Sequence, residues 1–318
     1  MVFGFLKLLF AGFCNWLKVC TARLAGTGAA RLAVAGAVVL AACVASWGQG
    51  YDGSRVRWHD EGRDTVTIND FLARCEGAGL ETPGERVAFL GRLFVGRPYV
   101  AHTLEGDVEL LTVNVDEVDC TTFVESVLAL AKTVGEGRGS WRDFVFNLEQ
   151  LRYRGGVMDG YGSRLHYICD WVMDNSYRGN VRDVTEDFGS VSYAVKSIDF
   201  MSAHRGSYAQ LGDSAVYERI RAVEEGYRNH RFPYVKSRNL GRRDVRSCFR
   251  DGDVVALTTS VPGLDVSHLG IVVMGDEGEP HLLHASSSLG CVVVSDVPLA
   301  VFMKRNGSLT GVRVLRLK

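Results

Sequence analysis

Proline is scarce in this chain of 318 residues, and low-complexity tracts are missing. Six prolines and a 47% share of hydrophobic residues argue against a disordered protein, and they leave material for one well-packed domain with an appendage. The length allows one or two domains, and no internal repeat is visible. A formal net charge of -1 removes the bulk electrostatic argument for nucleic acid, so we expect no nucleic-acid partner.

The first 42 residues contain no Asp or Glu, but they hold four basic residues, Lys7, Lys18, Arg23 and Arg31. An apolar run from Leu32 to Val44 follows. A basic region before an apolar segment of ~7–15 residues is typical of an export signal. The run is shorter than the ~20 residues that a membrane span needs. We therefore expect an exported protein.

The apolar run ends in Leu40-Ala41-Ala42-Cys43, which resembles the lipobox of bacterial lipoproteins. The resemblance implies a signal peptide over residues 1–42, a lipid on the Cys43 thiol and anchoring to a membrane of the bacterial cell envelope. An uncleaved N-terminal anchor and an ordinary signal cleaved after a small residue are the alternatives. We expect residues 43–64 to form a tether and residues 65–318 to form the working domain.

Regular cysteine spacing is also missing. Beyond residue 43 there is neither a CxxC pair nor zinc-finger spacing among the five cysteines, which are Cys75, Cys120, Cys169, Cys248 and Cys291. An odd number without pattern predicts no disulfide framework, although a single disulfide among them stays open. One of the five is a candidate for a working thiol, and the others suit small buried positions.

Helical patterns dominate from residue 65 to about residue 228, and strand patterns follow residue 251. We expect helices over residues 83–94, 120–133, 141–151, 165–175 and 214–228. We expect strands over residues 253–258, 268–274, 281–285, 290–295 and 311–317. Helices first and strands last predict an α+β domain, with N-terminal helices packed on a C-terminal antiparallel sheet.

Cys120 begins the clearest amphipathic helix of the chain. Unpaired backbone N–H groups and the positive end of the helix dipole favour a thiolate at such a position. A buried structural cysteine is the commoner role of a lone Cys, but this position favours a nucleophile.

Two histidines fall on consecutive predicted strands. His268 lies at the start of one strand, and His284 lies on the next, so a hairpin can bring the two rings together. His268 is then the candidate base, and His284 the residue that orients its ring. A zinc site of His268, His281 and His284 is the rival interpretation, but residues 281 and 284 point to opposite faces of a strand. We expect neither a metal ion nor another cofactor.

The segment 159–171 concentrates side chains that can contact a substrate. Arg164 can make a bidentate bond to a carboxylate, and aromatic rings offer stacking surfaces. A capped, partly buried helix explains the aromatic residues equally well but not Arg164 and His166 together. The candidate substrate-binding residues are Ser163, which suits an N-cap, Arg164, His166, Tyr167, Asp170, which shares a helical face with His166, and Trp171.

Two strings about twenty residues apart carry a resemblance to a known superfamily. Gly96-Arg97-Pro98-Tyr99 and Asp119-Cys120-Thr121-Thr122-Phe123 resemble the G-x-P-Y…D-C-[ST]-x-F pattern of NlpC-type cell-wall cysteine hydrolases. His268-Leu269-Gly270-Ile271 and the later His284 match the order Cys…His…His. The resemblance implies a papain-like fold, with Tyr99 beside the Cys120 nucleophile.

Four strings are similar to one branch of this superfamily, the N-acetylmuramoyl-L-alanine amidase-like family: residues 118–125, 163–167, 265–270 and 281–287. The resemblance implies a peptidoglycan or muropeptide substrate, cut at the amide bond between N-acetylmuramic acid and L-alanine. An endopeptidase for the D-Glu–diamino acid bond of the stem peptide is the alternative among enzymes. A catalytically inactive cell-wall-binding lipoprotein is the alternative among other classes.

Overall fold

The computed structural model describes residues 53–318. The predicted signal peptide and the lipidated Cys43 lie outside the described residues. Residues 53–64, which were expected to belong to a tether, lie within the folded unit instead. They form β1 (Val56–Trp58) and the start of α3 (Glu61–Cys75), and the Asp64 side chain is fully buried. The domain therefore begins earlier than the sequence pattern indicated.

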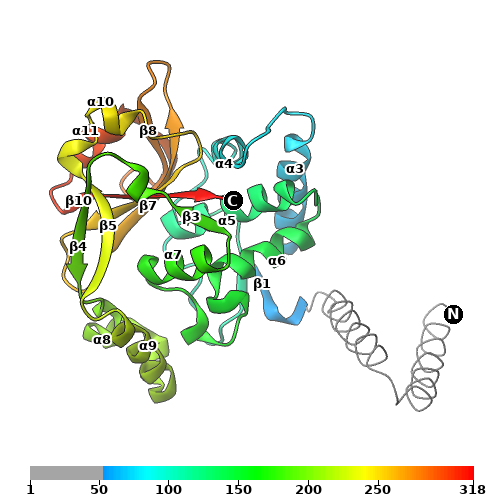
Figure 1. The fold of residues 1–318 in the computed structure, drawn as a ribbon. Coiled ribbons are helices and arrows are strands. Elements are labelled where there is room, and N and C mark those ends of the chain that lie inside the picture. The colour runs from blue at the N-terminus through cyan, green and yellow to red at the C-terminus, as the bar shows by residue number, and fades with distance from the viewer. Residues whose placement is uncertain (1–52) are drawn as a thin grey trace, which may run out of the picture. The chain divides into compact units, whose positions relative to one another are not determined.

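Five helices precede most of the strands, as the sequence pattern predicted, and they lie side by side in Figure 1. They are α3, α4 (Pro83–Arg92), α5 (Cys120–Gly135), α6 (Trp141–Arg152) and α7 (Ile168–Tyr177). Thr82 with Glu85 and Ser140 with Asp143 form capping boxes that start α4 and α6. Four shorter or later helices complete the domain: α8 (Phe200–Ala203), α9 (Ser214–Gly226), α10 (Arg243–Arg246) and α11 (Leu299–Lys304).

The main sheet of the described chain is antiparallel and has the order β4-β5-β10-β6-β7-β8-β9, with β3 paired to β10. Its strands are β3 (Val181–Asp183), β4 (Val191–Lys196), β5 (His230–Lys236), β6 (Val254–Thr259), β7 (Val266–Met274), β8 (Pro280–Ser286), β9 (Cys291–Pro298) and β10 (Leu309–Leu317). The α+β architecture with an antiparallel sheet is confirmed. A separate parallel pair joins β1 to β2 (Leu111–Val113).

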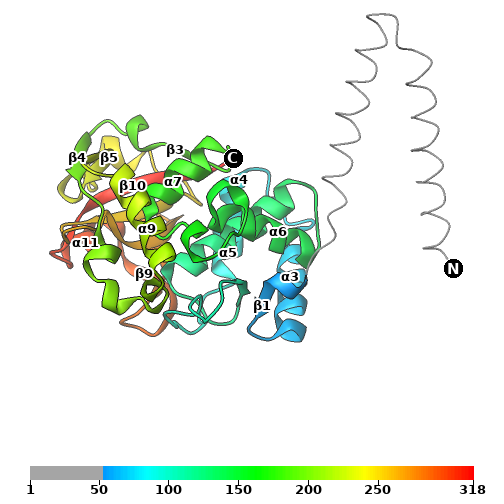
Figure 2. The ribbon, with the colours of Figure 1, turned by 90° about the horizontal axis from the view of Figure 1, so that it is seen from below.

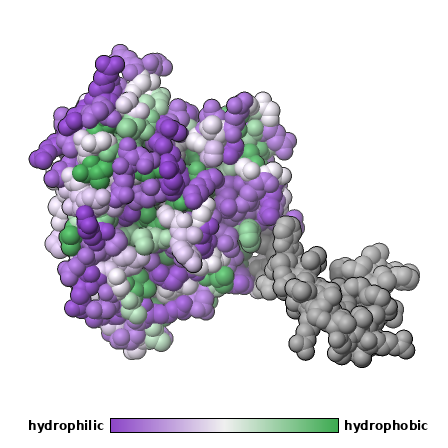
Figure 3. Space-filling model, viewed as in Figure 1, coloured by the Kyte–Doolittle hydropathy of each residue, from purple (hydrophilic) through white to green (hydrophobic). Residues whose placement is uncertain are grey.

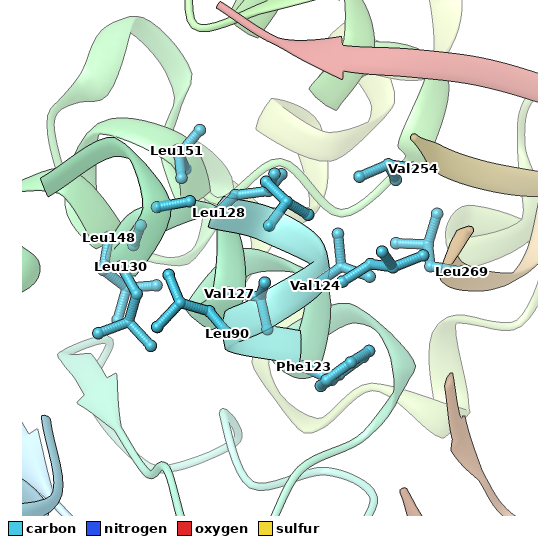
Figure 4. Close-up of a cluster of buried hydrophobic side chains, with 14 of the residues drawn as sticks. Leu90, Phe123, Val124, Val127, Leu128, Leu130, Leu148, Leu151, Val254 and Leu269 are labelled. Carbon is cyan, nitrogen blue, oxygen red and sulfur yellow. The ribbon is translucent and has the colours of Figure 1, made fainter. Parts of the chain in front are cut away.

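Helix α5 lies at the centre of the larger core. Its apolar face contacts α4, α6 and the inner residues of β6 and β7, and Figure 4 shows Phe123, Val124 and Val127 between Leu90 and Leu269. Burial of such a side chain stabilises the folded state by ~1.5–3 kcal/mol relative to exposure. The opposite face of the sheet carries a second core with α10 and α11. Because α5 packs against the sheet, its first residue is held close to β7.

Within residues 53–318, every helix is too short or too polar to cross a membrane.

Candidate active site

Helix α5 begins at Cys120, as the sequence pattern predicted. The carboxylate of Asp119 is the N-cap: its Oδ1 accepts hydrogen bonds from the backbone N–H groups of Thr121 at 2.9 Å and Thr122 at 2.8 Å. The Thr122 hydroxyl in return accepts the Asp119 N–H at 2.8 Å. This reciprocal box fixes the backbone on both sides of Cys120. The position of the thiol is therefore set by the helix start.

The Cys120 thiol lies beside β7. The backbone N–H of Leu269 donates toward it, and the Tyr99 hydroxyl is close enough that the charge of Cys120 contributes to the raised pKa of Tyr99. Burial and the Asp119 carboxylate nevertheless raise the pKa of Cys120 to about 11. The expected thiolate is thus not favoured, because desolvation and the neighbouring anion outweigh the effect of the helix start.

The two predicted histidines meet on one face of the β7–β8 hairpin. His268 Nε2 and His284 Nδ1 form a hydrogen bond of 2.8 Å, and the rings stand nearly perpendicular at 88°. The His284 ring also packs edge-on against Phe302 of α11. Burial lowers the pKa of His268 to about 4 and that of His284 to about 3. Both rings are therefore neutral at neutral pH.

Cys120 and His268 are brought together through shared neighbours. Within the described chain they are not hydrogen-bonded to each other, but the thiol interacts with the N–H of Leu269, the residue directly after His268. Asp119, directly before Cys120, favours the charged form of His268. The site therefore assembles from the first turn of α5 and the first residues of β7.

A cavity of about 150 Å³ opens next to Cys120. Its wall contains the residues on either side of the cysteine, Asp119 and Thr121, and a group of charged side chains. The lining residues are His102, Leu104, Glu105, Asp119, Thr121, Glu125, Arg152, Arg164, Leu165 and His166.

With Arg152, Arg164 is one of two buried arginines in this cavity wall. It pairs with Glu105 at 2.8 Å and Glu109 at 3.5 Å, and its guanidinium lies over the Tyr161 ring. The Glu109 side chain is 5% exposed, whereas that of Glu105 is 42% exposed. A ligand carboxylate can thus replace Glu105 on Arg164 with little loss of free energy, because the Glu105 side chain is already partly exposed to solvent.

A second buried ion pair forms the floor. Glu125, on α5 below Cys120, accepts a 2.6 Å bond from Arg152 Nε, and Arg152 also donates to the Thr112 carbonyl. Both side chains are at most 3% exposed. Burial of such an ion pair carries an unfavourable desolvation free energy, but the pair fixes the positions of the groups it joins. It therefore holds α5, α6 and β2 in a fixed arrangement below the site.

His166 lines the cavity and Ser163 directly precedes Arg164, and both have roles that the sequence did not indicate. His166 Nε2 bonds to the Tyr161 carbonyl at 2.9 Å, and burial lowers its pKa to about 3. Ser163 does not cap a helix; its hydroxyl accepts the Asp159 N–H and donates to the Gly160 carbonyl. Residues 163–166 precede α7, because Arg164 and Leu165 pair with Tyr153 and Arg152 instead.

The remaining three predicted residues face the interior. Tyr167 bonds to Glu224, Asp170 pairs with Arg154 at 2.5 Å, and the Trp171 ring is 4% exposed within the main core. Because α7 starts at Ile168, His166 and Asp170 do not share a helical face. The expectation of open stacking surfaces at Tyr167 and Trp171 does not agree with this placement.

All five described cysteines are free thiols. The residues of the rival zinc interpretation have different partners, since His281 Nδ1 bonds to the Ser295 carbonyl while His284 bonds to His268.

Comparison with known proteins decides the family. Residues 89–310 match the family model AmiA-like, described as N-acetylmuramoyl-L-alanine amidase-like. The chain belongs to this amidase-like family. The match covers the first residues of α5, the cavity wall and both histidine strands, so every feature of the site lies within it.

Solved structures support the same assignment. An N-acetylmuramoyl-L-alanine amidase from Bacteroides uniformis is 40% identical, and the match covers 74% of this chain and 99% of that chain with a TM-score of 0.68. A further structure of that name from the same organism is 42% identical over 72% of this chain and 97% of its own, with a TM-score of 0.65. A Legionella pneumophila protein of the DUF1460 family, 21% identical with a TM-score of 0.63, covers 81% of this chain and 96% of its own and shares the fold. None of the curated proteins is similar enough to count as a match.

Sequence reasoning missed two elements of the site in the amidase-like chain. Asp119 was not singled out, although its place directly before a helix-start cysteine marks it as an N-cap that must lie beside the thiol. Glu105 and Glu109 carry no local signal, because only the folded loop 101–110 brings them to Arg164.

Proposed function

We propose that this protein is a cysteine amidase of peptidoglycan that hydrolyses the bond between N-acetylmuramic acid and L-alanine. The family supports the substrate class and the hydrolytic reaction, and the relatives from Bacteroides uniformis carry the name of this activity. We assign the fold to the papain-like NlpC type on the order of its elements, in which a helix that starts with cysteine packs on a sheet that carries histidine.

One observation carries the proposal: a thiol at the first turn of α5 faces the strand whose histidine is hydrogen-bonded to a second histidine. A nucleophile, a base and an orienting group in this order form the unit that acyl transfer needs. A merely structural cysteine would not require the two neutral, buried imidazoles beside it.

The first step is attack on the lactoyl carbonyl of the muramic acid. With its proton on Nε2, His268 donates to His284 and keeps the Nδ1 lone pair for the thiol proton. The sulfur then bonds to the carbonyl carbon, and the carbonyl π electrons move onto oxygen. The backbone N–H of Cys120, at the helix start, and the Tyr99 hydroxyl stabilise this oxyanion.

The second step breaks the carbon–nitrogen bond. The proton on His268 moves to the departing amine of L-alanine, which leaves as a stem peptide with a free N-terminus. The lactoyl group remains on Cys120 as a thioester. Water, deprotonated by His268, attacks the thioester and releases the muramic acid carboxylate and the free thiol.

The electrostatics of the site favour this general-base route. A thiol with a pKa of about 11 and an imidazole with a pKa of about 4 are both neutral at neutral pH, so proton transfer accompanies attack. Asp119 lies where it stabilises the imidazolium that forms in that step. The cavity with Arg164 receives the stem peptide, whose carboxylate takes the place of Glu105.

The sequence also supports export of the protein and attachment to the cell envelope through Cys43, which would keep it beside its polymer. This localisation belongs to the proposal.

The test is digestion of purified peptidoglycan by the wild type and by Cys120→Ala, with products analysed by mass spectrometry. We expect the wild type to release stem peptides that begin with L-alanine, and Cys120→Ala to keep its fold and release none. Release of fragments cut after D-Glu would indicate the endopeptidase instead. Inactive wild type with intact muropeptide still bound would indicate the binding protein. Iodoacetamide labelling is a poorer criterion, because a thiol with a pKa of about 11 reacts slowly at neutral pH.

A further inference from the structure

Positive charge is concentrated in one short part of the domain. Residues 228–250 hold eight Lys or Arg against one Asp, whereas the other described residues hold 24 basic and 35 acidic residues. A separation of this size gives one end of an otherwise acidic domain a strongly positive potential. The catalytic site lies outside this segment and does not use it.

The fold gathers this segment into one surface. The 3-10 helix η7 (Ser237–Asn239) and α10 lie beside α11, and Leu240 and Val245 share a buried core with Leu299 of α11. A Cβ on Gly241 would lie 3.8 Å from the Ala300 side chain. We call the outer side of these three elements the basic face. Figure 1 shows α10 and α11 together at one end of the domain, and hydrophilic residues cover that end in Figure 3.

Three cations of the basic face lack a partner. Arg242 is neutralised by Asp244 at 2.8 Å and Arg246 by Glu279 at 2.6 Å. Arg238, Arg243 and Lys304 are exposed, and within residues 53–318 their side chains form neither an ion pair nor a hydrogen bond. Because no neighbouring carboxylate in the described part of the chain neutralises them, these exposed cations are available to bind an external anion.

The position of the face limits the partner. Figures 1 and 2 both place α11 and β1 at opposite ends of the domain, so a membrane anchor before residue 53 would join the domain at the far end. The exposed residues of η7, α10 and α11 include no aromatic side chain on which a base could stack. Arginine favours phosphate oxygens, which it binds with two parallel N–H bonds.

We propose that the basic face binds an anionic envelope polymer that carries phosphodiester groups, such as a polyol phosphate chain. The contact holds the enzyme on the wall through a surface that does not include the cavity next to Cys120. It goes beyond the proposed amidase activity and does not require it.

The test measures binding of fluorescently labelled inorganic polyphosphate to the full-length protein in a nonionic detergent, by anisotropy at a series of salt concentrations. The face variant combines Arg238→Glu, Arg243→Glu and Lys304→Glu. The matched control reverses three exposed cations elsewhere, Arg142→Glu, Arg221→Glu and Lys318→Glu. We expect wild type and control to bind with an affinity that falls with salt, and the face variant to bind at least ~10-fold more weakly.

Three results would overturn the proposal: equal losses in both triple variants, no binding of polyphosphate by the wild type at low salt, or displacement by single-stranded DNA at lower concentration than by unlabelled polyphosphate. A neutral variant with Gln at the same three positions should bind with intermediate affinity and excludes misfolding. Cleavage of a small soluble muropeptide should be equal in all variants. Failure of the amidase reaction would leave the polyphosphate result unchanged, so the two proposals are tested separately.

Discussion

Single residues decide how the thiol of this site is activated. Cys120 occupies the helix start that the sequence predicted, yet the Asp119 carboxylate that starts the helix also raises the pKa of the thiol. The same charge raises the pKa of His268 against the effect of burial. In the proposed mechanism, Asp119 therefore makes the resting thiol less reactive and stabilises the imidazolium that forms during the reaction.

Asp119→Asn separates these two effects. Asparagine keeps the cap, because its oxygen accepts the same N–H bonds, but the negative charge is lost. We expect the pKa of Cys120 to fall below about 11, so alkylation at pH 8 becomes faster. We expect kcat on muropeptide to fall roughly tenfold, since a nearby charge in a partly buried site contributes on the order of 1–2 kcal/mol.

Asp213→Asn is the matched control. Asp213 caps α9 by accepting N–H bonds from Ala215 and Val216, so it has the same cap geometry away from Cys120. Faster alkylation in both variants, or in neither, would contradict the role of the Asp119 charge.

Helices and strands with a clear periodicity of apolar residues or a capping residue could be predicted from the sequence. Those without either could not. The prediction of α5 followed from its amphipathic pattern. The capping residues Thr82 and Ser140 mark the starts of α4 and α6, and the late strands followed from their apolar alternation. β1, β2 and β3 are three residues long and show no period, and β4 and β5 lie in or next to a region expected to be helical. α7 begins three residues late because Arg164 and Leu165 bond to another segment instead.

The turn that leads into β7 depends on one lysine. Lys196, the last residue of β4, donates from Nζ to the carbonyls of Thr259, Val261 and Leu264 at 2.6–2.8 Å. Lys196→Met removes the Nζ donor from all three carbonyls, and we expect a loss of roughly 1–3 kcal/mol in the free energy of unfolding. Lys304→Met, on an exposed lysine, should cost nothing measurable. Urea titration checks both, and equal midpoints would refute this role of Lys196.

At the scale of the whole domain, buried histidines make stability depend on pH. Burial lowers the pKa values of His166, His268 and His284 to about 3, 4 and 3, below the ~6.5 of an unfolded chain. As the pH falls below 6.5, these histidines become protonated in the unfolded chain but stay neutral in the folded domain. The free energy of unfolding therefore decreases toward pH 4. Buried carboxyls with raised pKa values, such as Glu125 and Asp265, oppose this loss.

His166→Gln isolates one histidine outside the His268–His284 pair. Glutamine can donate to the Tyr161 carbonyl but does not titrate, so the variant should lose about 2 kcal/mol less than wild type between pH 7 and pH 5. For a domain of this size that equals ~4–8 °C in Tm. His204→Gln, at an exposed histidine, should follow the wild type. Parallel melting curves for all three proteins would contradict the account.

The whole-molecule topology was predictable only in outline. The order of the predicted helices and strands along the chain indicated an α+β domain. It did not show that β10 pairs with β3, β5 and β6, which come from three different parts of the sequence. The pairing of His268 with His284 was predictable because consecutive strands form a hairpin, whereas the cavity next to Cys120 depends on a loop and two helices that meet only in the folded chain.

The most direct test of the account is to trap the acyl-enzyme. Wild-type protein is mixed with excess muropeptide, quenched in acid within a single turnover, and examined by intact-mass and peptide-mapping mass spectrometry. The account predicts a mass increase equal to the glycan with its lactoyl group, located on the peptide that contains Cys120 and absent from Cys120→Ala. An adduct on another residue, or full turnover by Cys120→Ala, would contradict it.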